Sequence, residues 1–361
     1  MINNTFIIAE AGVNHNGDIN TALKLVDIAS DSGADAVKFQ TFNTNKLTTK
    51  RARLSDYQNY NNNTDLSQQD LLRSLELSVR DYIKLSEYCN SKNIEFMSTA
   101  FDVNSLDFLI KETNLKRIKI PSGENINPFL LLKAARSNLP IIVSTGLSEL
   151  NEIKSCLSIL AYGFINKYKI PTTKEALNAY RSPKSRKSLL EKVTILQCVS
   201  DYPALPEDMN IKAMVNLGNI YNLSYGLSDH SIGIEISIAA VALGATVIEK
   251  HFTLDKNMKG PDHKASLSPL ELTNMVRSIR VVEKSLGNGE KKPSRNELKN
   301  LNSIRGSLVA KKNIKKNTEF SKNNITVKRP GDGLSPLKFL DLNGTKSKKN
   351  FKLDEQIIIN E

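Results

Sequence analysis

The chain contains no tryptophan, only four histidines and only three cysteines in 361 residues. The cysteines, Cys89, Cys156 and Cys198, are odd in number and far apart, and no CxxC pair occurs. This spacing argues against a disulfide framework and against a thiolate zinc site, since both need cysteines in pairs or close groups. A reducing compartment, the cytoplasm, suits such a chain.

Long apolar runs are also missing. No uninterrupted apolar stretch approaches the roughly 20 residues that a membrane-spanning helix needs. The first residues lead almost directly into FIIAEAG, and they lack the basic region, apolar core and cleavage site of a signal peptide. We therefore expect a soluble, intracellular protein without a membrane partner.

Positive charge exceeds negative charge, with 50 Lys and Arg against 38 Asp and Glu and a pI near 9.4. The positive residues are scattered, apart from short clusters such as KSRK (184–187) and KSKK (346–349). No basic stripe interleaved with aromatic residues occurs, so the pattern of a nucleic-acid surface is absent. We interpret the excess charge as a solvated surface with a local bias toward anionic substrates, and we expect no nucleic-acid partner.

Short apolar runs alternate with amphipathic stretches through most of the chain. The amphipathic stretches predict helices, including 19–32, 81–91, 231–243 and 268–286. The apolar runs predict eight strands, at 6–10, 36–40, 95–100, 117–122, 141–146, 193–199, 222–230 and 246–252. Such alternation is typical of parallel βαβ units, and eight of them over roughly 280 residues match a (β/α)8 TIM barrel. The alternative is an open doubly wound sheet. For that fold we would expect a GxGxxG motif after a strand, and the sequence contains none.

The pattern changes after the barrel domain, which we place at residues 1–286. GNGEKKPSRNELKN (287–300) is predicted to be a linker, and residues 301–361 to be a small, mostly β domain. Its predicted short strands lie in SLVAKKNI, NNITVKRPGDG, SPLKFLDLNGT and DEQIIINE. Two stretches interrupt the barrel pattern. Residues 41–80, with NYNNNTD (59–65), form a long polar loop that is either a lid or a mobile segment, and residues 163–192 are interpreted as a surface insertion.

Polar side chains gather where the predicted strands end. In a barrel of this kind the carboxyl ends of the strands share one face, and catalytic groups come from that face. Any single Ser or Thr there is more often a turn residue or a helix cap, but the joint pattern predicts an active site. The residues are Glu10, Lys38, Gln40, Ser98, Thr99, Lys119, Ser122, Glu124, Ser144, Ser228, His230, Glu249 and His251.

Two of the four histidines lie in EKHFTLDKNMKGPDHKAS (249–266). His230 and His251 end neighbouring predicted strands, so two imidazoles are expected at one pocket mouth. Neutral imidazoles suit Mn²⁺ or a similar divalent metal, with the remaining positions open to water and substrate oxygens. From the residues alone, two hydrogen-bonded core histidines fit about as well. Glu249 lies two residues before His251 and therefore on the same side of its strand.

Eight motifs in one order carry a resemblance to a known family. They are IIAEAGVNHNGD (7–18), AVKFQTF (36–42), STAFD (98–102), IKIPSGE (118–124), VSTG (143–146), GLSDHSIG (226–233), EKHFTLD (249–255) and GPDHKAS (260–266). Together they closely resemble the sialic acid synthase family, the N-acetylneuraminate synthases. The C-terminal segment from SLVAKKNI to RPGDGLSP resembles the antifreeze-like (SAF) domain of that family, so the resemblance covers nearly the whole chain.

The resemblance implies a transferase that condenses phosphoenolpyruvate with an N-acylated mannosamine-type sugar and water. The products are a nine-carbon 2-keto-3-deoxy acid and phosphate, which leaves by C–O cleavage. The family's fold is a (β/α)8 barrel, and its cofactor is a divalent cation, here expected to be Mn²⁺, with Mg²⁺ or Co²⁺ as alternatives. The resemblance also implies a homodimer in which the small domain of one chain covers the partner's barrel mouth.

The same resemblance implies roles for single residues. The metal ligands are His230 and His251, and Glu249 supports the metal or binds the sugar. Glu124 handles the proton of water or of the departing phosphate. The residues expected to surround phosphoenolpyruvate are Thr99, Lys119, Ser122, Ser144 and Ser228, with a contribution from Ser200. Lys38 and Gln40 flank the same mouth and are also expected to bind substrate. The sugar contacts are Glu10, Tyr202 and Asp262, together with Arg329, which reaches the partner's sugar N-acyl group, and Phe101 is expected to bind substrate. The residues expected to be catalytic are Glu10, Lys119, Glu124 and Glu249.

The sequence leaves some alternatives open. N-acetylmannosamine would give N-acetylneuraminate, whereas a 2,4-diacetamido-2,4,6-trideoxy-mannose would give a legionaminic-type acid. The altrose isomer used by pseudaminic acid synthases fits GPDHKAS less well. A non-catalytic carbohydrate-binding protein is the alternative of a different class, but it predicts a degraded pocket, and the expected pocket residues are all present. His263 is expected near the sugar rather than on the metal, and the role of His15 stays open.

Overall fold

The computed structural model of the protein describes residues 4–49, 51–53 and 67–359. The chain divides into two compact units, Met1–Gly287 and Asn288–Glu361. The second unit begins within the predicted linker, which contains a short helix, α14 (Arg295–Lys299). In the described ranges no helix is both long and apolar enough to cross a membrane.

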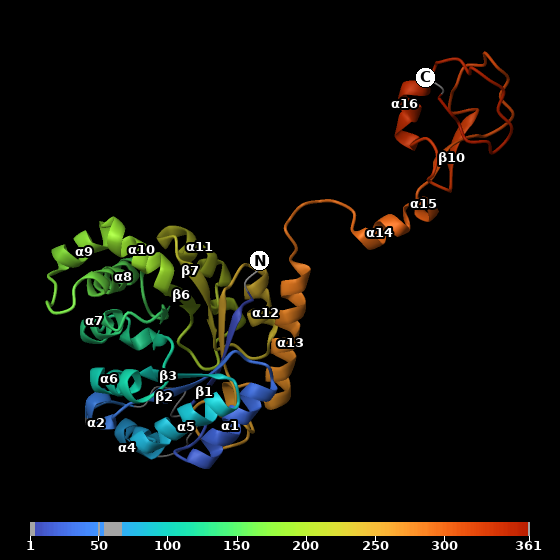
Figure 1. Ribbon diagram of the computed structural model, residues 1–361. Coiled ribbons are helices and arrows are strands. Elements are labelled where there is room, and N and C mark those ends of the chain that lie inside the picture. Colours follow the sequence, from blue (N-terminus) through green and yellow to red (C-terminus); the bar gives the residue numbers. More distant parts are fainter. Residues whose placement is uncertain (1–3, 50, 54–66, 360–361) are drawn as a thin grey trace. The chain divides into compact units, whose positions relative to one another are not determined.

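Eight parallel strands of the first unit close into a barrel (Figure 1). Each strand pairs with its neighbours in chain order, and β1 completes the ring by pairing with β8. Closure confirms the predicted (β/α)8 barrel and excludes the open sheet, which would leave two edge strands unpaired. The strands are β1 (Phe6–Gly12), β2 (Ala36–Thr41), β3 (Glu95–Ala100), β4 (Ile118–Ile120), β5 (Ile141–Ser144), β6 (Val193–Cys198), β7 (Ser224–Asp229) and β8 (Val247–His251).

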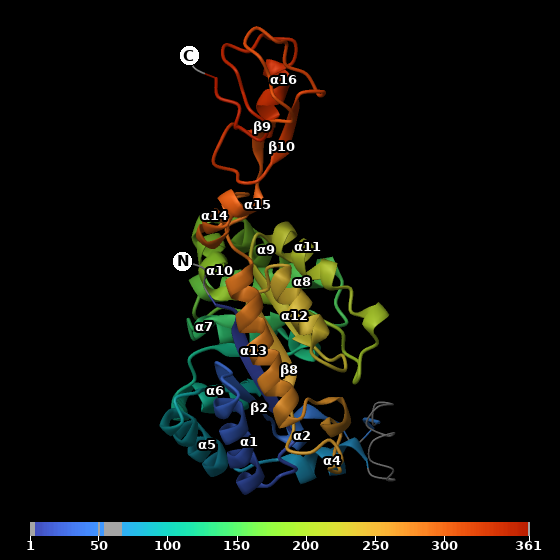
Figure 2. The same cartoon turned by 90° about the vertical axis from the view of Figure 1, so that its right-hand side faces the viewer.

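Helices follow the strands and surround the barrel (Figures 1 and 2). Their starts are set by local side-chain caps. Asp18 accepts hydrogen bonds from the backbone N–H groups of Asn20 and Thr21, and Ser268 forms a capping box with Glu271. The helices are α1 (Ile19–Asp31), α5 (Val79–Ser91), α6 (Val103–Glu112), α7 (Pro128–Arg136), α8 (Leu150–Ile165), α11 (Ile211–Tyr221), α12 (Glu235–Ala242) and α13 (Pro269–Ser285).

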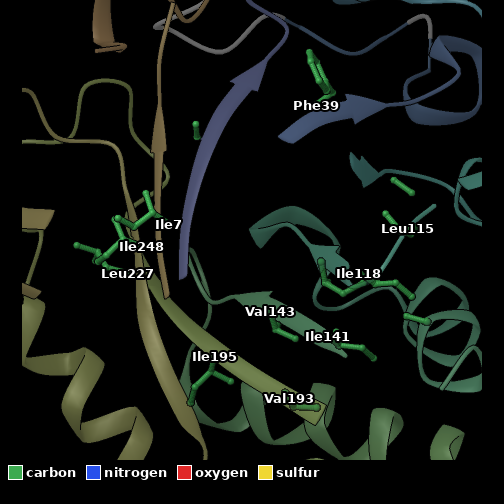
Figure 3. Packing of buried hydrophobic residues seen from close by; sticks show 14 of the residues in the cluster. Ile7, Phe39, Leu115, Ile118, Ile141, Val143, Val193, Ile195, Leu227 and Ile248 are labelled. Atoms are coloured by element: carbon green, nitrogen blue, oxygen red, sulfur yellow. The ribbon is translucent and has the colours of Figure 1, made fainter. Parts of the chain in front are cut away.

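Alternate strand residues face outward and form the main core against the helices. Figure 3 shows this layer, in which branched aliphatic side chains prevail. The period of two that places these residues outside also places their sequence neighbours inside the barrel. The outward layer includes Ile7, Val37, Phe39, Ile118, Val143, Ile195, Leu227 and Ile248.

The inside of the barrel holds an apolar layer of its own. It is formed by Ile8, Ala36, Met97, Ile142, Leu196 and Val247. Gly226 lies in register with Leu196 and Val247 and leaves room for both. Each of these residues stands two positions before an inward-facing residue at the carboxyl end of the same strand, and all of those residues except Cys198 are polar. The apolar layer therefore forms the floor beneath the expected site.

Residues 163–192, interpreted from the sequence as a surface insertion, are largely helical. They contain the end of α8 and two further helices, α9 (Thr173–Arg181) and α10 (Pro183–Lys192), and both pack against α8. The 41–80 segment contains α2 (Thr44–Leu47) and α4 (Gln68–Leu75). The polar run NYNNNTD lies outside the described residues, so its interpretation as a lid or a mobile segment stays a prediction.

The second unit has its own small core, which includes Leu308, Ile314, Phe320, Ile325 and Phe351. After α15 (Leu301–Ile304), β9 (Ser307–Ala310) pairs with β10 (Ile325–Lys328) in an antiparallel ribbon (Figure 2).

Two strands predicted in the second unit are wrong. SPLKFLDLNGT forms a 3₁₀ turn and a short helix, α16 (Phe339–Leu342), because its inward apolar residues Phe339 and Leu342 stand three apart, as on a helix. In DEQIIINE, the residues up to 359 make a single bridge, from Gln356 to Val309.

Gly226→Ala tests the packing of the barrel interior. An added Cβ would lie 2.1 Å from the Val247 carbonyl oxygen and 2.9 Å from Leu196 Cδ2. We expect the free energy of unfolding to fall by about 1–3 kcal/mol, measured by urea titration with far-UV circular dichroism. Gly123→Ala is the matched control, because a Cβ there meets no heavy atom within 4 Å. Equal losses in the two variants would contradict the proposed packing.

Candidate active site

A cavity of about 560 Å³ opens at the carboxyl ends of the barrel strands. It brings together every residue to which the family resemblance assigns a role except Arg329, which belongs to the second unit and is exposed directly after β10. The lining residues assigned from the sequence are Glu10, Lys38, Gln40, Thr99, Phe101, Lys119, Ser122, Glu124, Ser144, Ser200, Tyr202, Ser228, His230, Glu249, His251 and Asp262. Their roles stay predictions.

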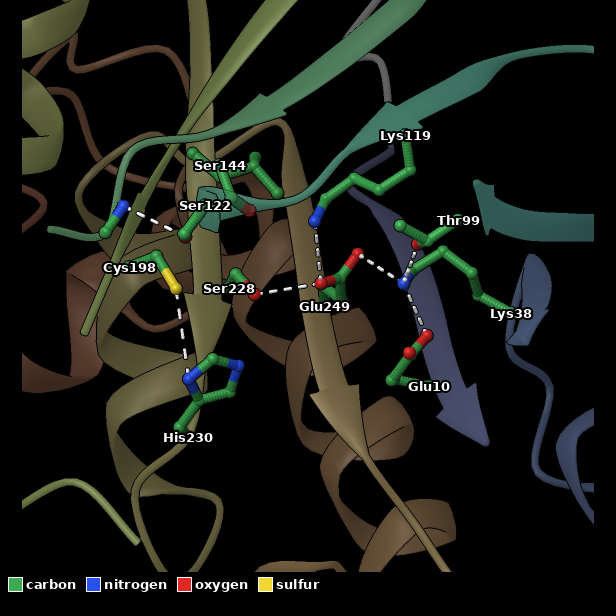
Figure 4. A network of polar contacts seen from close by, with 12 residues as sticks. Glu10, Lys38, Thr99, Lys119, Ser122, Ser144, Cys198, Ser228, His230 and Glu249 are labelled. Carbon is green, nitrogen blue, oxygen red and sulfur yellow. Dashed lines mark hydrogen bonds and ion pairs between the residues drawn. The ribbon is translucent and has the colours of Figure 1, made fainter. Parts of the chain in front are cut away.

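Four charged side chains form a buried network at the base of the cavity (Figure 4). Lys38 Nζ lies 2.6 Å from Glu10 Oε2 and 3.6 Å from Glu249 Oε2, and Lys119 Nζ lies 3.1 Å from Glu249 Oε1. The hydroxyl of Ser228 donates a hydrogen bond of 2.9 Å to the same Glu249 oxygen. Glu249 is therefore the shared anion of two buried lysines.

Burial and pairing move the pKa values of the two carboxyls in opposite directions. Burial raises the pKa of Glu10 to about 7, although Lys38 opposes the change. Burial also acts to raise the pKa of Glu249, but Lys119 and Lys38 outweigh it and hold that pKa well below its usual range. Burial lowers the pKa of Lys38, but its two carboxylate partners more than compensate and raise it. At neutral pH the network thus contains one firmly ionised carboxylate and one that titrates.

Serine hydroxyls cluster beside Lys119 at the ends of β4 and β5. The backbone N–H of Gly146 donates to Ser122 Oγ at 3.0 Å. A Cβ on Gly146 would lie 2.4 Å from Ser200 Oγ, so only glycine lets these loops approach so closely. Among the described residues, the buried hydroxyl of Ser144 has no hydrogen-bond partner. A buried hydroxyl without a partner is costly, and an anion in the cavity would satisfy it.

His230 and His251 lie side by side at the mouth, with ring centroids 5.4 Å apart. The ring of Tyr202 stacks on His230 with centroids 4.1 Å apart. Nδ1 of His230 lies 2.6 Å from the Val199 carbonyl, which can only accept, so Nδ1 donates and Nε2 keeps the lone pair. Nδ1 of His251 is buried, without a hydrogen-bond partner among the described residues, and lies 3.8 Å from Asp262 Oδ2.

This donor set fits a divalent metal. A ligating histidine commonly donates its other ring N–H to a carbonyl, as His230 does. Burial and the nearby positive groups lower the pKa of His251 well below its usual value and leave its imidazole neutral. Burial acts to lower the pKa of His230, but Cys198 and the Val199 carbonyl outweigh burial and raise that pKa overall. A metal ion at His230 would therefore compete with a proton. The described residues include no group of three or more His, Cys, Asp or Glu placed to hold a metal, so the other ligands would be water or substrate.

Two further carboxyls line the cavity. Burial raises the pKa of Asp262 to about 6. Glu124 is half-buried, and burial raises its pKa although Asn127 Nδ2 donates a 2.6 Å hydrogen bond to Oε2. Both groups can therefore exchange protons closer to neutral pH than an exposed carboxyl does.

Comparison with known proteins agrees with this geometry. Residues 25–291 match the NeuB family and residues 305–358 match the SAF domain. The chain belongs to the NeuB family. The resemblance to the sialic acid synthases found in the sequence is thereby confirmed, and so is the SAF domain that follows the barrel domain in the chain.

Relatives of this NeuB-family chain align with it over nearly its full length. It is 46% identical to the N,N'-diacetyllegionaminic acid synthase of Campylobacter jejuni, over 98% of either chain. It is 44% identical to the N,N'-diacetyllegionaminic acid synthase of Legionella pneumophila, over 96% of this chain and 91% of the relative. Among solved structures, the N-acetylneuraminic acid synthetase of Leptospira borgpetersenii in complex with citrate has a TM-score of 0.67 at 34% identity, covering 84% of this chain and 93% of that one.

Three polar residues considered from the sequence lie outside the lining of the NeuB-family cavity. Ser98 lies near the end of β3, as expected, but it faces the opposite side of the strand from Thr99, shares a 2.6 Å hydrogen bond with Thr41 and does not line the cavity. His263 Nδ1 pairs with Thr253 Oγ1 at 2.6 Å, and Nδ1 of His15 accepts from the Gly17 N–H. Local hydrogen bonds therefore hold both histidines.

One wall of the cavity, apart from Phe101, was not predicted from the sequence. It is apolar and comes partly from α2 and α4, within the segment considered only as a polar loop. Phe42 and Phe101 meet edge to face, with centroids 6.2 Å apart. The hydrophobic spacing of QQDLLRSL was the available signal, since it places leucines on one helical face. We call this surface the apolar wall; it consists of Val13, Phe42, Leu47, Leu72, Leu75 and Phe101.

Glu249→Leu tests the charged network of the NeuB-family barrel. The change leaves Lys119 buried without its carboxylate, whereas Lys38 keeps Glu10. We expect the free energy of unfolding to fall by about 3–5 kcal/mol, measured by urea titration. Glu249→Leu combined with Lys119→Met removes the unpaired cation as well and should recover most of the loss. A double variant no more stable than the single one would contradict the pairing.

Proposed function

We propose that the protein is a nonulosonic acid synthase that condenses phosphoenolpyruvate and water with an N-acylated, mannosamine-type sugar. The observation that carries the proposal is that two buried lysines, Lys38 and Lys119, line one cavity with Ser144, whose buried hydroxyl has no hydrogen-bond partner among the described residues. Phosphoenolpyruvate is a small trianion, and it needs cations and hydroxyl donors in this combination. The names of the relatives support the same class of reaction.

The chain's own residues divide the work on phosphoenolpyruvate. Lys119 and the hydroxyls of Ser122, Ser144 and Ser200 receive the phosphate end. Lys38 and Thr99 receive the carboxylate end, since Lys38 Nζ already donates to Thr99 Oγ1 at 2.9 Å. The pKa of Glu10 is about 7, and the negative charge of phosphoenolpyruvate favours the protonated form of this carboxyl. The carboxylate of phosphoenolpyruvate then displaces Glu10 from Lys38.

Proton transfer falls to the carboxyls at the rim. Glu124, whose pKa is raised by burial, exchanges a proton with the attacking water or the leaving phosphate. Glu10 and Asp262 bind sugar hydroxyls. His230 and His251 would hold a divalent metal, Mn²⁺, which when bound would supply Lewis acidity toward the sugar's carbonyl oxygen. In a homodimer, the exposed Arg329 reaches the N-acyl group of the partner's sugar.

The apolar wall favours one sugar. In a 2,4-diacetamido-2,4,6-trideoxy-mannose, C6 is a methyl group and C4 carries a second acetamido group. N-acetylmannosamine carries hydroxyl groups at both of these positions. Those groups suit a surface of leucine and phenylalanine. In the described part of the chain, the lysines and arginines lining the cavity are Lys38 and Lys119 alone, so a phosphorylated sugar would find no further cation of this kind. We therefore place the enzyme with the legionaminic acid synthases.

The test is phosphate release from phosphoenolpyruvate with Mn²⁺, with each sugar in turn, followed by the mass of the product. We expect release that depends on the diacetamido-trideoxy sugar, stops when the metal is chelated and returns when Mn²⁺ is added back. Faster turnover of N-acetylmannosamine would contradict the choice of sugar while preserving the synthase. No release with either sugar, or with the altrose isomer, would overturn the synthase.

Leu72→Gln tests the role of the apolar wall. Leu72 is half-buried on α4 and lines the cavity. We expect the KM for the diacetamido-trideoxy sugar to rise about tenfold because an apolar contact is lost, with the KM for phosphoenolpyruvate unchanged. Leu72→Met keeps volume and polarity and is the matched control. Equal effects on both substrates, or on both sugars, would show that the wall does not select the substrate.

A further inference from the structure

A second buried ion pair lies behind the two histidines, on the outer side of β7 and β8. Lys250 Nζ lies 3.0 Å from Asp229 Oδ2, and the side chains are 1% and 0% exposed. Neither residue lines the cavity. The other outward positions of these strands hold the hydrophobic residues Tyr225, Leu227 and Ile248, so two charged residues there require an explanation.

Serine residues complete the pair into a network. Ser231 donates to Asp229 Oδ1 through its backbone N–H at 2.9 Å and its hydroxyl at 2.6 Å. Ser237, on α12, donates to Asp229 Oδ2 at 2.6 Å. Lys250 Nζ in turn donates to the Ser231 carbonyl at 2.5 Å. The network therefore joins the end of β7, the turn after it, α12 and β8.

The position of this network relative to the histidines is specific. Asp229 and Ser231 are the residues on either side of His230, and Lys250 immediately precedes His251. Because strand side chains alternate, the charged pair faces outward while the imidazoles face the cavity. The pair thus ties the backbone that carries one histidine to the backbone that carries the other.

Stability alone does not account for such a pair. Replacing a buried ion pair by apolar residues of similar volume is often neutral or stabilising, so this pair is better explained by the geometry it imposes. We propose that Asp229 and Lys250 are positioning residues that hold His230 and His251 at the separation a divalent metal requires. The inference rests on the metal site of the proposed function.

The experiment measures Mn²⁺ binding directly, without substrates, from the electron paramagnetic resonance signal of free Mn²⁺. The full-length variants are Lys250→Met and the double variant Asp229→Leu, Lys250→Met. We expect the Kd for Mn²⁺ to rise about 10- to 100-fold in both, as is usual when the residues that support metal ligands are lost. The double variant removes both charges, so it should melt at a higher temperature than Lys250→Met, although the buried hydroxyls of Ser231 and Ser237 lose their acceptor.

A matched control breaks an ion pair at the opposite end of the strands. Arg280 Nη2 lies 2.7 Å from Asp35 Oδ2, and the same oxygen accepts from the Ile7 N–H. Asp35→Asn should lower the melting temperature and leave the Kd for Mn²⁺ unchanged. Ser237→Ala removes a single bond to Asp229 and should weaken Mn²⁺ binding by about threefold, which keeps the test valid if the charge variants fold poorly.

The outcomes separate the two proposals. Wild-type affinity for Mn²⁺ in the double variant and in Ser237→Ala would overturn the positioning role and leave the metal site intact. If the wild type and His251→Ala bind Mn²⁺ equally, the metal site itself is wrong, and the positioning role falls with it. Weaker binding in the Asp229 and Lys250 variants, with Asp35→Asn unaffected, is the result that supports the inference.

Discussion

Closure of the barrel forces the inward side chains of eight strand ends into one small volume, and four of them are charged. Lys38, Lys119, Glu10 and Glu249 are almost completely withdrawn from water, so each must find its counter-charge among the other three. An apolar floor two residues below keeps water from entering from the other end of the barrel. The raised pKa of Glu10 follows from this confinement, and the hydroxyl of Ser144, which has no hydrogen-bond partner in the part of the chain that the structure describes, lies in the same enclosed volume.

The two faces of a strand end serve different purposes in this molecule. On the inner side, Ser228 of β7 and Glu249 and His251 of β8 line the cavity, together with His230, which directly follows β7. The outward residues bind the same strand ends to each other and to α12 through a charged pair. The inward and outward residues can differ in this way because successive side chains of a strand point to opposite faces of the sheet. Preorganisation of the site thus extends one layer beyond the residues that touch it.

The barrel and most of its site were predictable because both depend on local patterns. Apolar runs such as IIVS form strands wherever they are buried, and a polar residue after such a run lies at the carboxyl face. The patterns failed where tertiary contacts decide. SPLKFLDLNGT reads as a strand, yet Phe339 and Leu342 meet the small core as a helix. Ser98 and Thr99 are neighbours of similar chemistry, and only the register of β3 determines which faces the cavity.

By itself the sequence determined the fold class, the family and the residue types at the mouth of the barrel. These follow from the alternation of strands and helices and from the order of the motifs, which are local properties of the sequence. Only the tertiary structure decided which lysine pairs with which carboxylate, that leucines of α4 meet Phe101 in one wall, and that Lys250 contacts Asp229. These partners are far apart in the chain. Their contact follows from barrel closure and strand register, which depend on all eight strands together and not on any local pattern.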